Sequence, residues 1–234
     1  MVSRKLCLAQ EPEADKLLSE DDFALLTGML LDQQFPLEHA FRGPKKIADR
    51  MDGFDVHKIA AADPEEFEEL GATPPAIHRY GRSMARRTQE LARYVVEHYD
   101  GKTSEIWTRD DPDGKEVLRR LKELPGYGDQ KARIFLALLG KQLGVRPAGW
   151  EQAAGAYSEP NSRRSAADIV DSDSLLEVRA FKKQMKAAAK ESAAAKSTKT
   201  ATTKARTARA RTAKGTDAKP EAVKPGTAKA RSAK

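Results

Sequence analysis

Residues 115–144 constrain the fold of this chain more than any other segment. They read KEVLRRLKELPGYGDQKARIFLALLGKQLG. Apolar residues recur there at helical spacing on both sides of a short turn. They are Val117, Leu118, Leu121 and Leu124 before the turn, and Ile134, Phe135, Leu138 and Leu139 after it. The pattern predicts two amphipathic helices joined by Leu124-Pro125-Gly126-Tyr127-Gly128.

The turn has features that suit a phosphate. Gly126 and Gly128 allow positive φ and leave no side chain in the way of a close approach. Backbone N–H groups at the start of the second helix form a concave donor site for an anion. Lys131 and Arg133 lie about one turn into that helix and add positive charge. An ordinary helical hairpin that binds nothing is the alternative, but this pattern favours contact with the DNA backbone.

The segment resembles the hairpin of the helix-hairpin-helix DNA glycosylases, the endonuclease III-like (HhH-GPD) superfamily. The resemblance rests on LPGYG at 124–128, followed by Lys131, Ala132 and an apolar helix. It implies an all-α, glycosylase-like domain that holds double-stranded DNA largely through its phosphates. It also allows for a monovalent cation at the hairpin.

A second motif lies upstream, where Leu30-Leu31-Asp32-Gln33-Gln34 follows the most apolar segment of the chain. It resembles the S-Q-Q motif of the same glycosylases, in which a polar side chain fills the gap left by an extruded base. Such enzymes must flip the base, because its glycosidic bond is inaccessible within the stack. The resemblance makes Gln33 and Gln34 candidates to probe an opened duplex. Alternatively, the two glutamines merely end a helix at the surface.

The chain departs from the family at the catalytic acid. Active members have an Asp some 20 to 22 residues after the last hairpin glycine, where this chain has Ala148, Gly149 and Trp150. Glu151 is the nearest acid and is the candidate catalytic carboxylate, since an oxocarbenium-like transition state needs negative charge. Glu151 is equally suited to complement the dipole at a helix N-terminus.

Lyase activity is not expected. Members that cleave the strand have a Lys two residues after that glycine, but this chain has Gln130 there and Lys131 next. A shift of one residue rotates a side chain by about 100° around a helix. We therefore expect Lys131 to point away from the nucleophile's place.

Aromatic residues that could line a base pocket, or else belong to the core or rim, are Phe35, His78, Tyr80, Trp150 and Tyr157. Trp150, beside Glu151, and Tyr80 are the preferred candidates. No cofactor is expected: Cys7 is the single cysteine, so an iron–sulfur cluster and a cysteine-bound zinc have no ligands. The four histidines show no metal-binding spacing.

The segment before the tail is expected to form one helical domain, residues 1–185, with the hairpin at 115–144. Start signals for helices stand at Ser19-Glu20-Asp21-Asp22, at Asp63-Pro64 and at Ser174-Leu175-Leu176-Glu177. A long helix with Met84, Leu91 and Val95 on its apolar side follows Pro75. Only Lys5 to Ala9 is strand-like.

The predicted tail, residues 186–234, is rich in Lys, Ala, Thr and Arg. Residues 187–234 hold 13 Lys/Arg and 3 Asp/Glu, a net charge of +10, whereas the rest of the chain carries −3. A segment with a single Val and no Leu, Ile or aromatic residue is expected to be disordered. It resembles linker-histone tails, and its charge predicts phosphate neutralisation without sequence readout. A solubility aid is the alternative.

No run of about 18 apolar residues exists, so no membrane association is expected. We expect a cytoplasmic, nucleoid-associated protein with no obligate protein partner. Two functions remain open. One is a monofunctional DNA glycosylase that uses Glu151, and the other is a non-catalytic DNA-binding protein on a degenerate glycosylase fold.

Overall fold

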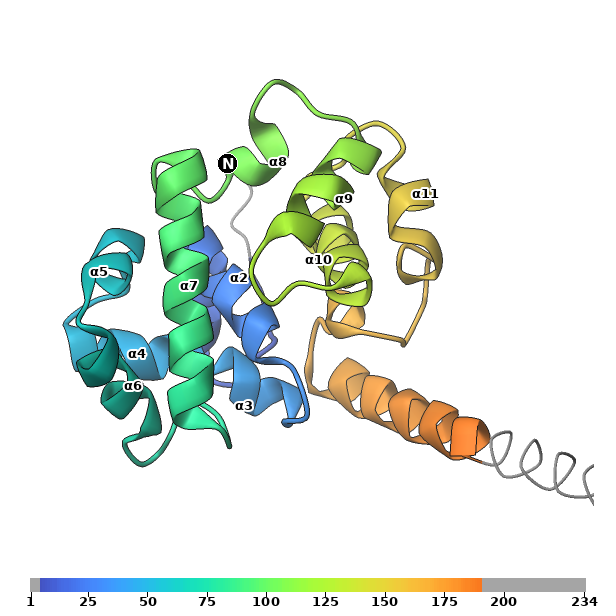
Figure 1. The fold of residues 1–234 in the computed structure, drawn as a ribbon. Helices are drawn as coiled ribbons and strands as arrows, with labels where there is room; N and C mark the ends of the chain where they lie inside the picture. Colours follow the sequence, from blue (N-terminus) through green and yellow to red (C-terminus); the bar gives the residue numbers. More distant parts are fainter. Residues whose placement is uncertain (1–4, 191–234) are drawn as a thin grey trace, which may run out of the picture. The chain divides into compact units, whose positions relative to one another are not determined.

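The computed structural model describes residues 5–190. The chain divides into two units, Met1–Lys183 and Gln184–Lys234. In the described part of the first unit the regular structure is helical, without a strand (Figure 1), which confirms the all-α prediction. The strand expected at Lys5–Ala9 is wrong. Its backbone N–H groups at Leu6 and Ala9 donate to the side chains of Ser19 and Asp15 instead of to another strand.

The helices follow one another along the chain with short connections. They are α1 (Pro12–Glu20), α2 (Asp22–Leu31), α3 (Leu37–Phe41), α4 (Gly43–Met51), α5 (Val56–Ala61), α6 (Pro64–Ala72), α7 (Gly81–Tyr99), α8 (Glu105–Thr108), α9 (Gly114–Glu123), α10 (Asp129–Gln142) and α11 (Trp150–Ala154). Two 3-10 turns follow, η1 (Gly155–Tyr157) and η2 (Ala166–Asp168). Residues 172–190 are again helical.

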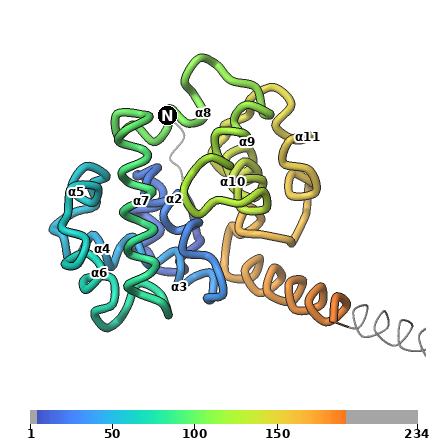
Figure 2. Tube along the Cα trace, in the orientation of Figure 1, coloured from blue at the N-terminus to red at the C-terminus, as the bar shows by residue number. Residues whose placement is uncertain are grey.

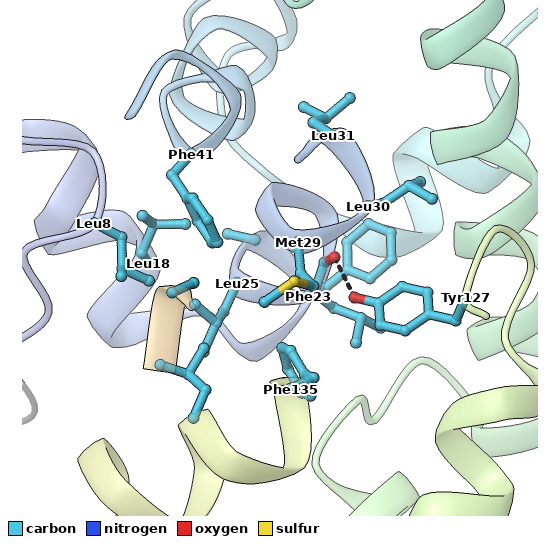
Figure 3. Packing of buried hydrophobic residues seen from close by; sticks show 14 of the residues in the cluster. Leu8, Leu18, Phe23, Leu25, Met29, Leu30, Leu31, Phe41, Tyr127 and Phe135 are labelled. Carbon is cyan, nitrogen blue, oxygen red and sulfur yellow. Dashed lines mark hydrogen bonds between the residues drawn. The ribbon is translucent and has the colours of Figure 1, made fainter. Parts of the chain in front are cut away.

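Helix α2 forms the centre of the first unit. Every residue from Phe23 to Leu31 is buried, as its continuous apolar sequence predicts. Figures 1 and 2 show α4, α5 and α6 on one side of α7, and α9, α10 and α11 on the far side of α2. Side chains of α2 pack between Phe41 of α3 and Phe135 of α10 (Figure 3). The C-terminal end of α2 is thereby held between the two groups of helices.

At two of the three expected helix starts, the capping residue differs from the serine that the motif predicts. Asp21, not Ser19, caps α2 by accepting from the Ala24 N–H, because Ser19 lies in the last turn of α1. The final helix is capped by Asp171, which accepts from the Ser174 N–H, three residues before the predicted position. The Asp63-Pro64 start of α6 is confirmed, since the Asp63 carboxylate accepts from two backbone N–H groups.

The final helix continues beyond the domain boundary expected at residue 185. Residues 186–190 are helical, which corrects the prediction that the tail is disordered from residue 186. Alanine and lysine are strong helix formers, so the run AAAK at 187–190 extends the helix. The remainder of the predicted tail, 191–234, lies outside the described residues.

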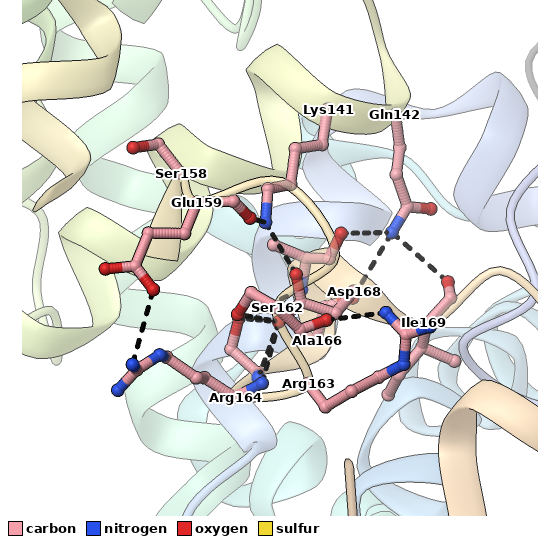
Figure 4. Close-up of polar contacts among 12 residues, drawn as sticks. Lys141, Gln142, Ser158, Glu159, Ser162, Arg163, Arg164, Ala166, Asp168 and Ile169 are labelled. Carbon is pink, nitrogen blue, oxygen red and sulfur yellow. Dashed lines mark hydrogen bonds and ion pairs between the residues drawn. The ribbon is translucent and has the colours of Figure 1, made fainter. Parts of the chain in front are cut away.

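A buried polar cluster attaches the segment after α11 to the C-terminal end of α10 (Figure 4). Lys141 of α10 lies 2.6 Å from the carboxylate of Asp168, whose side chain is 3% exposed. Asp168 also accepts from the Ser162 hydroxyl and from the backbone of Arg164. Gln142 donates to three carbonyl groups between residues 166 and 169. These contacts provide partners for the polar groups of the loop and hold it in place, since the loop has few large apolar side chains to bury.

Candidate nucleic-acid interface

The predicted hairpin is present, and its turn is anchored to α2. Helix α9 ends at Glu123 and α10 begins at Asp129. Leu124 and Tyr127 are buried between them. The Tyr127 hydroxyl donates to the Leu26 carbonyl over 2.6 Å, and burial raises the pKa of this phenol well above its usual range (Figure 3). The apolar residues of the turn therefore hold the hairpin rigidly on the central helix.

The two hairpin glycines have different roles. Gly126 has φ +80°, and a Cβ there would lie 2.4 Å from Cδ1 of Leu30. Gly128 has φ −93°, and a Cβ there would meet nothing within 4 Å. Gly126 therefore uses the positive φ that glycine allows, whereas Gly128 does not. Its contribution is the open space that it leaves in front of the start of α10.

The start of α10 has the polarity of an anion site. Gly128 is its N-cap and offers no side-chain hydrogen bond. The first N–H groups of a helix have no carbonyl partner within it, and the helix dipole favours negative charge there. The carboxylate of Asp129 already stands at this end, and Lys122 and Arg133 bind it at 3.1 and 2.7 Å. Hydrogen bonds from these two cations lower the pKa of Asp129.

Arg133 lies within a network of intramolecular contacts. Besides its ion pair with Asp129, it donates to the carbonyl of Ala153 in α11. The guanidinium thus joins the start of α10 to the end of α11. A contact between Arg133 and a DNA phosphate would have to compete with both partners.

Lys131 extends toward α2. Its ammonium donates to the carbonyl of Leu30, in the last turn of that helix. Burial lowers the pKa of Lys131 to about 8, and Arg87 lowers it further, whereas Asp32 opposes the shift. Lys131 is therefore a partly desolvated cation that points to Leu30, the first residue of the glutamine motif.

Gln33 meets Lys131 at the same acceptor. The side-chain amide of Gln33 donates to the Leu30 carbonyl over 3.1 Å, and its oxygen accepts from Arg87 of α7 at 3.3 Å. Gln34, in contrast, is exposed and has φ +53°. The structure therefore brings the hairpin and the glutamine motif together at the C-terminal end of α2.

Three of the five candidate aromatic residues lie beside this motif. The ring of His78 packs 4.5 Å from that of Phe35 and 5.7 Å from that of Tyr80. Nδ1 of His78 accepts from the backbone of Tyr80, so its Nε2 is protonated and donates to the Gln33 carbonyl over 3.1 Å. Burial lowers the pKa of His78, which favours this neutral form. Tyr80 is 49% exposed, and the guanidinium of Arg79 lies over its ring, 4.7 Å from the centroid.

Asp32, directly before the glutamines, is a carboxylate that the sequence analysis did not single out. Its side chain is 18% exposed and lies 4.0 Å from the ammonium of Lys182. Burial raises the pKa of Asp32, whereas Lys182 and Lys131 lower it. A cavity of about 210 Å³ adjoins it, lined by Asp32, Phe35, Pro36, Leu37, Leu175, Val178, Arg179 and Lys182. In the sequence, the signal for a role of Asp32 is its position within the motif Leu30-Leu31-Asp32-Gln33-Gln34.

A family model described as "HhH-GPD superfamily base excision DNA repair protein" matches residues 27–200. The chain belongs to the HhH-GPD superfamily. This match covers the glutamine motif, the hairpin and the described part of the final helix. The HhH-GPD chain is therefore a base excision DNA repair protein with DNA as its partner. No curated protein and no solved structure matches it.

Trp150 of this HhH-GPD protein lies away from the glutamine motif. Its ring covers Gly140, where a Cβ would lie 2.4 Å from the ring, and its backbone abuts Gly114. Gly140 is 12 residues after Gly128, or about 18 Å along α10. Tyr80 lies beside His78, so the two preferred base-pocket candidates contact different residues. Trp150 fills the seam between α9, α10 and α11.

Glu151 is exposed in the first turn of α11 of the HhH-GPD domain. Within the described part of the chain, its carboxylate has no hydrogen bond or ion pair. This placement suits an acid that complements the helix dipole. Among residues 5–190, no helix is both long and apolar enough to cross a bilayer.

Proposed function

We propose that this protein is a monofunctional DNA glycosylase that hydrolyses the N-glycosidic bond of a damaged or mismatched base. One observation carries the proposal. Lys131 of the hairpin and Gln33 of the upstream motif donate to the same carbonyl, that of Leu30. The element suited to the DNA backbone and the element suited to an opened duplex thus meet at one point. An enzyme that extrudes a base needs both at the same nucleotide.

The surroundings of that point suit an extruded nucleotide. The exposed ring of Tyr80 and the half-buried ring of Phe35 pack on the buried His78, and bases stack well on aromatic side chains. The exposed amide of Gln34 can enter the duplex, while Gln33 is held by Arg87. Hydrolysis also needs a carboxylate near the sugar, for which Glu151 is the candidate by sequence position. We expect no strand cleavage, because hydrolysis by water leaves an intact abasic site.

A non-catalytic DNA-binding protein is the second candidate. The observation that favours it is the exposure of Glu151, whose carboxylate has no partner in the described structure. A carboxylate in bulk water stabilises a cation weakly, since charges interact there with a high effective dielectric constant. A protein without an effective acid would bind and scan DNA without releasing bases.

A panel of duplexes tests the two functions. Each duplex carries one uracil, alkylated purine or oxidised base, and strand scission is measured before and after alkali. We expect scission only after alkali, on at least one lesion, and reduced turnover in Gln33→Ala and Gln34→Ala on paired lesions. Duplex binding without base release on any member of the panel would instead support the non-catalytic function. Scission before alkali would contradict the monofunctional assignment.

A further inference from the structure

Cleavage of an N-glycosidic bond develops positive charge on the sugar, and a preorganised carboxylate stabilises that charge. The stabilisation is strong only where water is largely excluded. Glu151 is exposed, so it lacks this property. An acid that supports the proposed reaction must be sequestered and must lie where the hairpin and the glutamine motif meet.

Asp32 meets both conditions. It follows the last turn of α2 and directly precedes Gln33, within two residues of the carbonyl that Lys131 and Gln33 share. Its side chain is largely withdrawn from water and borders the cavity of about 210 Å³. That volume exceeds the volume of a purine base. Apolar side chains that follow the motif and apolar side chains of the final helix form most of the cavity wall.

Burial raises the pKa of Asp32, and two ammonium groups oppose this effect. Lys182 lies 4.0 Å from its carboxylate, and the charge of Lys131 also lowers its pKa. The neighbouring acid Glu38 is differently engaged, since it pairs with Arg179. The cations that act on Asp32 belong to lysines on flexible stems. Such partners can rearrange when a cationic sugar approaches.

We propose that Asp32 is the catalytic carboxylate of this protein. It would take the role that an Asp after the hairpin has in active members of the family. The inference rests on the proposed glycosylase function. Water forms the new bond to C1′ of the sugar, and the N-glycosidic bond breaks with its electron pair leaving on the base. Asp32 stabilises the cationic sugar and accepts the proton of the attacking water. This proton then passes to solvent, and the departing base takes up one from solvent.

Two abasic-site analogues test the assignment without knowledge of the lesion. One duplex carries a pyrrolidine, whose ring nitrogen is cationic and mimics the charged sugar. The other carries a neutral tetrahydrofuran. The full-length protein should bind the pyrrolidine duplex at least about tenfold more tightly, as expected for a transition-state mimic. Asp32→Asn should abolish this preference and leave the affinity for tetrahydrofuran unchanged, because the amide keeps the shape and removes the charge.

The remaining variants distinguish an incorrect assignment of Asp32 from an incorrect glycosylase function. Asp49→Asn, which removes a surface carboxylate paired with Lys45, is the matched control and should keep the preference. A preference that survives in Asp32→Asn overturns the assignment, and its loss in Glu151→Gln moves the role to Glu151. Equal binding of both analogues by the wild type refutes the glycosylase function itself. Circular dichroism monitors folding, and Asp32→Ser replaces Asp32→Asn if the amide disrupts the fold.

Discussion

At the scale of single residues, Lys131 shows how a neighbour's position changes the chemistry of a side chain. The one-residue shift from the family's lysine position predicts a side chain that points away from the nucleophile's place. The observed side chain instead reaches the Leu30 carbonyl and is partly buried, which lowers its pKa to about 8. Its charge in the folded protein therefore depends on pH in a range where an exposed lysine is fully protonated.

Lys131 should make the free energy of unfolding rise with pH. Its folded pKa of about 8 lies below the value of 10.5 for an unperturbed lysine, so the unfolded chain binds more protons between these values. Between pH 8 and 9.5 the free energy of unfolding of the wild type should rise by about 1–2 kcal/mol relative to Lys131→Met. Urea titrations of both proteins at the two pH values measure this difference. Parallel pH profiles would mean that Lys131 titrates normally.

The hairpin glycines provide a matched pair. Gly126→Ala should reduce the free energy of unfolding by about 1–3 kcal/mol, because the alanine must adopt φ +80° and its Cβ meets Leu30. Gly128→Ala should leave stability within about 0.5 kcal/mol, since its Cβ enters open space. Yet Gly128→Ala should weaken duplex binding, because that space is where a phosphate would approach. Thermal unfolding and fluorescence anisotropy separate the two effects; full duplex affinity in Gly128→Ala would place the phosphate elsewhere.

At the scale of elements, polar contacts hold a segment that has little apolar packing of its own. The segment between α11 and the final helix has few large apolar residues, and the Lys141–Asp168 pair attaches it to α10 (Figure 4). Both side chains are largely buried, and Asp168 also accepts from neighbouring backbone and hydroxyl groups. Attachment of this segment sets where the final helix begins, and that helix supplies Lys182 beside Asp32.

Asp168→Asn should lower the free energy of unfolding by about 2–4 kcal/mol, because it leaves the buried ammonium of Lys141 without its counter-charge. Glu177→Gln is the control: it breaks an exposed pair with Arg163 and should cost less than about 1 kcal/mol. Chemical denaturation of the three proteins gives both differences. Equal costs for the two substitutions would show that the buried pair is no more important than a surface one.

At the scale of the whole molecule, charge and family membership suggest different roles for the helical part and for the basic segment. Residues 1–186 carry a net charge of −3, and residues 187–234 carry +10. The helical part belongs to a base excision repair family and holds the hairpin and the glutamine motif. The proposed DNA contacts of the hairpin and the glutamine motif would therefore be made by a mildly acidic body. The basic segment is therefore the main candidate for non-specific attraction to DNA.

Deletion of residues 187–234 should reduce non-specific duplex affinity and its dependence on salt. If about half of the 13 basic residues contact phosphates, the log–log slope should fall in magnitude by roughly 6, at ~0.9 per contact. Titrations of a lesion-free duplex between low and moderate salt measure the slope. An unchanged slope would contradict DNA binding by this segment and leave a role in solubility. Base release from a lesion-bearing duplex at low salt should be retained.

The sequence by itself determined the features that depend on neighbours along the chain. Helical periodicity predicted the two helices of the hairpin, and Asp63-Pro64 predicted the start of α6, because these signals act within a few residues. Local signals also misplaced two caps by two or three residues, since Asp21 and Asp171 competed with nearby serines. Only the tertiary structure decided which groups meet. The contact of Lys131 with Leu30 spans 101 positions, and Asp32 acquires its environment from a helix some 150 residues away. Burial and electrostatic pairing depend on these long-range contacts, and no spacing along the chain encodes them.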